Sequence, residues 1–105
     1  MKDFEKLKNH IREEIRDAED YIRDALACKD TCPERAEVYR RLAEEELGHM
    51  EALHAEIVRE IKKWQAENGN PPPDMQAKYN VLHEIFTGDA NKVRLMIKLY
   101  KEAGA

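Results

Sequence analysis

Apolar residues recur every three or four positions along most of the chain, and this spacing constrains the fold more than any other feature. In the first 29 residues the series is Phe4, Leu7, Ile11, Ile15, Ala18, Ile22 and Ala25. Such steps place side chains on one face of an α-helix, so residues from about 3 to 29 are predicted to form an amphipathic helix. The two-residue alternation typical of strands is not visible, and the predicted fold class is all-α.

A second amphipathic helix is predicted from about residue 33 to about residue 67. Its apolar positions are Tyr39, Leu42, Ala43, Leu47, Met50, Leu53, Ile57, Ile61 and Trp64. Pro33 suits the first turn of a helix, and Thr31 and Glu34 have the spacing of a capping box. The segment "ENGNPPPD" that follows cannot continue a helix, because proline has no amide hydrogen to donate. Residues 1–68 are therefore predicted to form an antiparallel hairpin of two long helices.

The last third of the chain is predicted to form two short helices, at about 74–87 and 90–103. Gly88 fits the end of the first and Asp89 the N-cap of the second. Leu95 and Leu99 extend the apolar surface of the last helix beyond one face, which is typical of a helix covered by a neighbouring subunit. We expect one helical domain over residues 1–105, with the hairpin at 1–68 and the two short helices within 74–105.

Composition excludes several classes of function. The formal net charge is −4, and no basic patch with interleaved aromatic residues is present, so the chain is not predicted to bind nucleic acid. No apolar run approaches the roughly 18 residues of a membrane span, and the N-terminus does not resemble a signal peptide. These features favour a cytoplasmic protein. Cys28 and Cys32 are then expected to be free thiols, because the cytosol is reducing.

Glu46 is the residue that the helical pattern does not explain. It lies about 20° from the centre of the apolar face of the second helix and is predicted to be buried. A buried carboxylate costs several kcal/mol unless it is paired, protonated or bound to a metal ion. His49 follows one turn later at the edge of the same face, and this Glu-x-x-His spacing lets the two side chains converge on one point.

The first helix offers a second carboxylate at the same height. Because the hairpin turns near residue 31, Glu14 is level with Glu46 and His49, and it lies about 65° from the centre of its own apolar face. Tyr21 follows two turns later on the same side, where it can hydrogen-bond a ligand carboxylate, relay an electron or simply pack at the edge of the core. A second pair, Glu51-x-x-His54, does not converge on the core, since Glu51 points outward; His54 is predicted to be a packed histidine.

Glu14, Tyr21 and the segment Glu46-Leu47-Gly48-His49 resemble the first half of a ferritin-like di-iron protein, as in rubrerythrins and short encapsulated ferritins. The resemblance covers about residues 10–60. Such bundles hold two metal ions with a Glu from each of two helices and Glu-x-x-His from each of the other two. Residues 74–105 contain no second Glu-x-x-His. The resemblance therefore implies that the four-helix bundle is completed by dimerisation.

The resemblance further implies that Glu14, Glu46 and His49 are metal ligands, with two iron or manganese ions held between the subunits of a homodimer or higher oligomer. It implies ferroxidase activity, in which Fe(II) is oxidised by oxygen or peroxide, with Tyr21 as the catalytic side chain. Enclosure within a protein shell is compatible with the likeness to encapsulated ferritins. The alternative is a non-catalytic helical interaction module, such as a phage or regulatory protein. In that case Glu46 forms a salt bridge across an interface, with Arg40, Arg41 and Lys63 as candidate partners.

Overall fold

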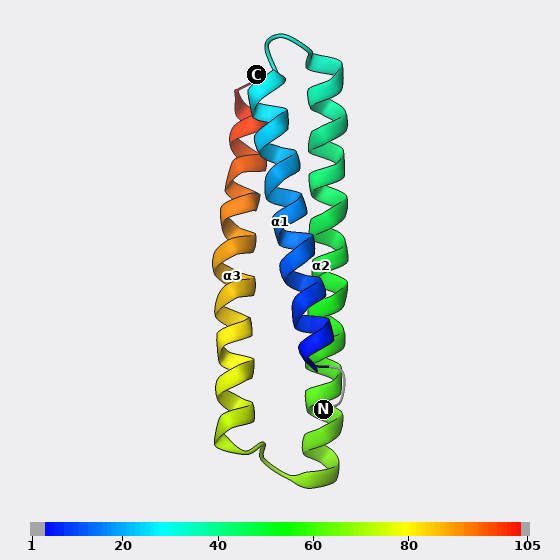
Figure 1. The fold of residues 1–105 in the computed structure, drawn as a ribbon, viewed down its shortest axis with the longest axis vertical. Coiled ribbons are helices and arrows are strands. Elements are labelled where there is room, and N and C mark those ends of the chain that lie inside the picture. Colours follow the sequence, from blue (N-terminus) through cyan, green and yellow to red (C-terminus); the bar gives the residue numbers. More distant parts are fainter. Residues whose placement is uncertain (1–3, 104–105) are drawn as a thin grey trace.

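The computed structural model describes residues 4–103, and they form three α-helices: α1 (Phe4–Cys28), α2 (Pro33–Asn68) and α3 (Pro73–Glu102) (Figure 1). The predicted all-α class is confirmed, and the described residues contain no strand. The molecule is a rod of 55 × 17 × 17 Å. None of the helices within residues 4–103 is long and apolar enough to cross a membrane.

The two long helices begin and end close to the predicted positions. Pro33 occupies the first turn of α2, as predicted. The predicted capping box is wrong, because the N-cap residue is Cys32 and no side chain caps the helix. The Thr31 hydroxyl instead donates to the Cys28 carbonyl oxygen at 3.4 Å. At the other end of α2 the chain turns at Gly69, whose φ of 84° lies in the left-handed region that glycine accommodates without strain.

The prediction of two short C-terminal helices is wrong, because α3 continues through Gly88 and Asp89 without interruption. A glycine inside a helix costs about 1 kcal/mol relative to alanine, whereas burying one large aliphatic side chain contributes about 1.5–3 kcal/mol. Leu82 and Val93, on either side of the glycine, are both buried. The packing of α3 against the rest of the bundle therefore outweighs the local weakness, and Asp89 is a mid-helix residue rather than an N-cap.

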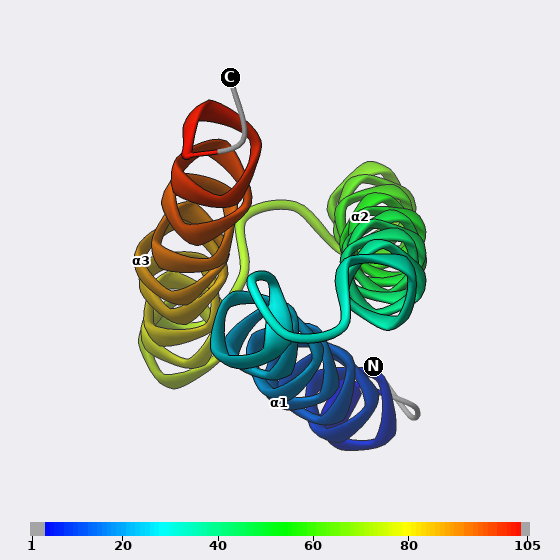
Figure 2. The ribbon, with the colours of Figure 1, turned by 90° about the horizontal axis from the view of Figure 1, so that it is seen from above.

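The core lies along the centre of the rod, where the three apolar faces meet. Seen from above, α1 lies between α2 and α3 and packs against both (Figure 2). α1 and α2 are antiparallel, and α3 runs in the same direction as α1 (Figure 1). The buried side chains are Phe4, Ile11, Ile15, Ala18, Ile22, Ala25, Ala36, Ala43, Leu47, Met50, Ile57, Leu82, Ala90, Val93, Ile97 and Tyr100.

Ion pairs at the rim join α3 to the other two helices. Lys92 pairs with Glu19 of α1 at 2.7 Å, and Arg94 pairs with Glu51 of α2 at 2.8 Å. Such exposed pairs contribute about 0–1 kcal/mol each, so they orient α3 more than they stabilise it. At the hairpin turn Cys28 and Cys32 are free thiols, as predicted.

Candidate metal site

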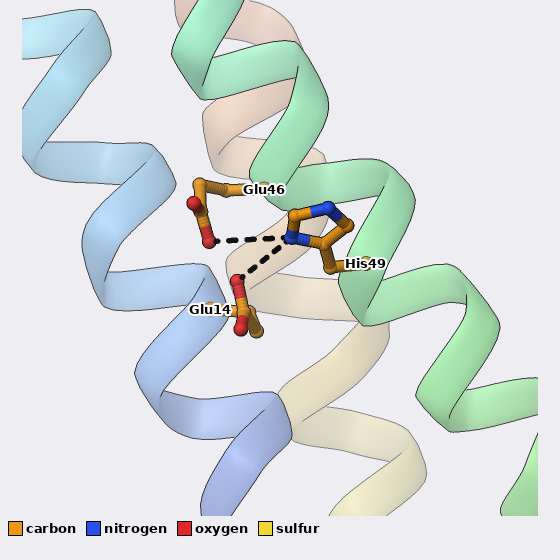
Figure 3. Close-up of side chains that lie close together, drawn as sticks. All are labelled: Glu14, Glu46 and His49. Carbon is orange, nitrogen blue, oxygen red and sulfur yellow. Dashed lines mark ion pairs between the residues drawn. The ribbon is translucent and has the colours of Figure 1, made fainter.

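Three predicted ligand residues meet at the seam between α1 and α2. Glu14 comes from α1, and Glu46 and His49 come from the facing turn of α2 (Figure 3). The His49 Nδ1 atom lies 3.5 Å from Glu14 Oε2 and 3.8 Å from Glu46 Oε2. One ligand atom from each residue lies within 4.8 Å of both others. Within residues 4–103 no further carboxylate, imidazole or thiol joins this cluster.

The hairpin itself positions these side chains. Ile11, Ile15 and Ala18 are buried along the centre of the rod, and Glu14 lies on the same helix turned toward α2. On α2, Leu47 is buried in the core next to Glu46. In an antiparallel hairpin that turns near residue 31, residues whose numbers sum to about 62 are level, and Glu14 comes close to this condition with both Glu46 and His49, at sums of 60 and 63. The apolar pattern of the two helices therefore fixes the height at which the carboxylates meet.

Glu46 is less buried than the sequence predicted. Its side chain is 20% exposed and that of Glu14 is 25% exposed, whereas His49 is 62% exposed. The prediction that Glu46 is buried is wrong for the single chain, because the seam between α1 and α2 leaves part of its side chain exposed and His49 lies on the solvent side of the seam. The seam nevertheless encloses one oxygen completely: Glu14 Oε2 is buried and has no hydrogen-bond partner among the described residues.

The two carboxylates have no lysine or arginine as counter-ion, and the only basic side chain beside them among the described residues is the His49 imidazole, which carries a charge only when it is protonated (Figure 3). Among the ion pairs of residues 4–103, neither Glu14 nor Glu46 pairs with a lysine or arginine. Arg40, one of the candidate partners of Glu46, instead pairs with Glu37 and Glu44 of its own helix. Two like charges within a few ångströms, one of them with an unsatisfied oxygen, are unfavourable unless a proton or a cation lies between them.

The cluster has the composition and nearly the dimensions of a metal site. For metal–ligand bonds of about 2.1 Å, neighbouring ligand atoms lie about 3.0–3.4 Å apart. The present spacing, from 3.5 Å up to 4.8 Å at most, exceeds the upper end of this range by at most about 1.4 Å. The two His49 distances are 3.5 Å and 3.8 Å, so the longest spacing is the one between the carboxylates, and rotation of the glutamate side chains would have to close it. Two carboxylates and one imidazole suit iron, manganese or zinc and leave coordination positions open.

Tyr21 lies outside the cluster, two turns along α1 from Glu14. Its half-buried ring stacks on Tyr39 of α2, with centroids 6.3 Å apart and an interplanar angle of 26°. The structure thus places Tyr21 in the packing between the two helices. Its role in catalysis stays a prediction.

The second Glu-x-x-His pair of α2 lies on the α3 side of the helix. His54 is half-buried, as predicted for a packed histidine, and its ring stacks on Phe86 at 4.0 Å. Burial, and secondarily the nearby His83, lower the pKa of His54. Glu51 is engaged by Arg94. Neither residue of this pair faces a second carboxylate, so it does not form a comparable site.

Comparison with known proteins does not place the chain in a family. No family model, no curated protein and no solved structure matches it. The likeness to ferritin-like proteins therefore rests on the few residues at positions 14, 21 and 46–49. Any function has to be argued from the geometry of these residues.

Proposed function

We propose that this chain binds a divalent transition-metal ion, iron or manganese, through Glu14, Glu46 and His49. The observation that carries the proposal is the enclosed Glu14 Oε2, which makes no hydrogen bond among the described residues and lies beside a second carboxylate and an imidazole. A cation at the centre of this cluster would give each of the three groups a partner. Carboxylates and imidazole are the ligands that iron and manganese accept in such sites.

A second copy of the chain would complete the coordination. One chain offers two carboxylates and one imidazole, fewer ligands than iron or manganese usually takes. Two copies related by a two-fold axis would bring four carboxylates and two imidazoles to one centre, with two ions per dimer. This is the ligand set of ferritin-like di-metal bundles. The exposure of His49 leaves the open side of the site accessible to such a partner.

When two redox-active ions are bound, such a centre supplies electron transfer from Fe(II) to oxygen or peroxide, which is ferroxidase chemistry. In this chain the carboxylates of Glu14 and Glu46 would neutralise the charge of the ions, and His49 would fix one ion from the solvent side. Tyr21 is the nearest candidate for a redox-active side chain on the same face of α1. The activity rests on the resemblance, whereas the metal site rests on the geometry.

Metal titration tests the site directly. Protein freed of metal with a chelator and then dialysed is titrated with Mn²⁺ by calorimetry, and with Fe²⁺ under anaerobic conditions. We expect about one ion per chain, because a ferritin-like bundle of two helical hairpins holds two ions. Glu46→Gln should abolish most of the binding. Glu45→Gln is the matched control, because the neighbouring Glu45 is exposed and the change removes the same charge. The proposal would be overturned if Glu46→Gln and Glu45→Gln lost metal binding equally, or if the wild type bound no metal.

The oligomeric state tests the shared centre separately. Sedimentation velocity should show a metal-dependent increase in mass that Glu46→Gln removes. If the chain binds no metal and still forms a dimer, the result would favour the alternative function, a non-catalytic interaction module. The position of the ion can be established independently from anomalous scattering at the iron or manganese edge in a crystal.

A further inference from the structure

The outward face of α3 carries an apolar stripe that the bundle covers only at Ile85, which is half-buried against the core. Of the five large apolar side chains exposed among the described residues, three lie on α3: Val81, Leu95 and Leu99, which are 50–57% exposed. They belong to a series with alternating steps of four and three, here called the outer stripe of α3. Its members are Val81, Ile85, Gly88, Lys92, Leu95 and Leu99. Such steps mark the contact line between two helices that pair side by side.

We propose that the outer stripe binds α3 of a second copy of this chain in antiparallel orientation. In an antiparallel pair around a two-fold axis, facing residues have numbers with a constant sum. When the numbers of facing residues sum to 180, each member of the outer stripe faces a member of the partner's outer stripe. Val81 then faces the partner's Leu99, and Ile85 faces the partner's Leu95. Gly88 faces the partner's Lys92, so that every large apolar residue of the stripe meets another.

Charges at the ends and flank of the stripe support this register. With the same sum, Lys78 faces the partner's Glu102, and both side chains are exposed. On the flank, Glu84 lies within two residues of the level of the partner's Lys98, which is within reach of these long side chains, and both residues are also exposed. The two-fold axis produces each pair twice. A parallel pair would instead place Lys78 and Lys92 against their own copies, so charge complementarity selects the antiparallel arrangement.

The middle of the stripe fits a close approach of two helices. A Cβ atom at Gly88 would meet nothing within 4 Å, so the fold of the single chain does not require glycine there. A partner helix would use the space by laying the aliphatic stem of its Lys92 across Gly88. Asp89 would then approach its own copy. Arg12 and Arg16 line the same cavity of about 400 Å³ as Asp89, and their positive charges would reduce this repulsion.

This surface is separate from the candidate metal site, which lies between α1 and α2 (Figure 3). The proposal therefore does not depend on metal binding. If both surfaces operate, each chain has two different two-fold contacts, and the assembly grows beyond a dimer into a closed ring or a filament.

Charge exchange between α3 helices tests the proposal. Sedimentation velocity is measured in chelator for the wild type, for Glu84→Lys, for Lys98→Glu and for an equimolar mixture of the two variants. Each variant alone places like charges at both symmetric positions, and we expect its self-association to weaken by about tenfold. In the mixture both positions carry opposite charges again, so association should return to the wild-type level.

Two further variants make the result unambiguous. Leu95→Glu puts a charge into the stripe and should leave a folded monomer, because this side chain is exposed in the single chain. Glu67→Lys is the control for Glu84→Lys, since it makes the same charge change at an exposed position of α2. A wild type that is monomeric at all concentrations overturns the proposal. An association that the α3 variants do not weaken, or that the mixture does not restore, overturns it as well.

Discussion

Helix α2 carries two Glu-x-x-His pairs five residues apart, and they have different surroundings. The pair at 46 and 49 faces α1, where it meets the carboxylate of Glu14 and no basic side chain among the described residues. The pair at 51 and 54 faces α3, where Arg94 engages Glu51 at 2.8 Å and His54 stacks on Phe86 at 4.0 Å. In the first pair Glu46 has no lysine or arginine beside it, whereas in the second pair Glu51 has Arg94 as its counter-ion and only the buried Nε2 atom of His54 lacks a hydrogen-bond partner among the described residues.

The difference follows from helix geometry. A step of five residues turns the side chains by about 140° around the helix, so the second pair meets a different neighbour. The spacing within each pair allows its two side chains to converge, but the facing helix decides what they converge on. The comparison teaches that a motif of this kind predicts a site only together with the residue opposite it, here Glu14.

The largest expected effect concerns metal affinity and the histidine of the first pair. His49→Ala should weaken Mn²⁺ binding by about 100-fold or more, since even partners behind the ligands of a metal site contribute 10- to 100-fold. The free energy of unfolding in chelator should change by less than about 0.5 kcal/mol, because the His49 side chain is 62% exposed. Calorimetric titration and urea unfolding measure the two quantities on the same sample.

The histidine of the second pair should behave in the opposite way. His54→Ala removes a ring that packs between α2 and α3, and we expect a loss of about 1–2 kcal/mol in the free energy of unfolding. The affinity for Mn²⁺ should stay at the wild-type value. If His54→Ala weakened metal binding as strongly as His49→Ala, the two pairs would not be functionally distinct.

Replacing Glu14 and replacing Glu51 by glutamine should change the free energy of unfolding in opposite directions. In metal-free protein at pH 8, Glu14→Gln should stabilise the fold by about 0.5–1 kcal/mol, because it removes a charge whose Oε2 is enclosed without a donor. Glu51→Gln should destabilise it by about 0–0.5 kcal/mol, since it breaks an exposed ion pair with Arg94. Urea unfolding midpoints with matched slopes test this. A destabilised Glu14→Gln would mean that the cluster is already satisfied without a metal ion.

The sequence was sufficient to predict the two long helices and the cluster of Glu14, Glu46 and His49. Both predictions rest on phase: the apolar steps set which face is buried, and the short break before Pro33 sets where the hairpin turns. The degree of burial could not be predicted in the same way. Glu46 lies near the centre of the apolar pattern, yet it is partly exposed, because the width of the contact between α1 and α2 depends on how closely the helices approach.

The break predicted at Gly88 was wrong for a reason that the sequence contains. Phe86, Val93 and Tyr100 follow one another at seven-residue steps, so the inner face of α3 keeps its phase across the glycine. Two separate helices would rarely preserve that phase. The Thr87 hydroxyl also fits a continuous helix, since it donates to the His83 carbonyl oxygen at 2.8 Å. Continuity of phase was therefore a better guide here than the local propensity of Gly88 and Asp89.

The smallest expected effect is a pH dependence that belongs to the second pair. Burial and the neighbouring His83 lower the pKa of His54 in the folded protein, so the unfolded chain binds a proton more readily. Stability should therefore fall as the pH drops through the unfolded value of about 6.5 toward the lower folded value. His54→Phe keeps a ring against Phe86 but cannot take up a proton, so its stability should change less between pH 8 and pH 5. Urea unfolding of both proteins in chelator at the two pH values measures the difference. If the wild type and His54→Phe lost the same free energy of unfolding between pH 8 and pH 5, the acid sensitivity would belong to groups other than His54.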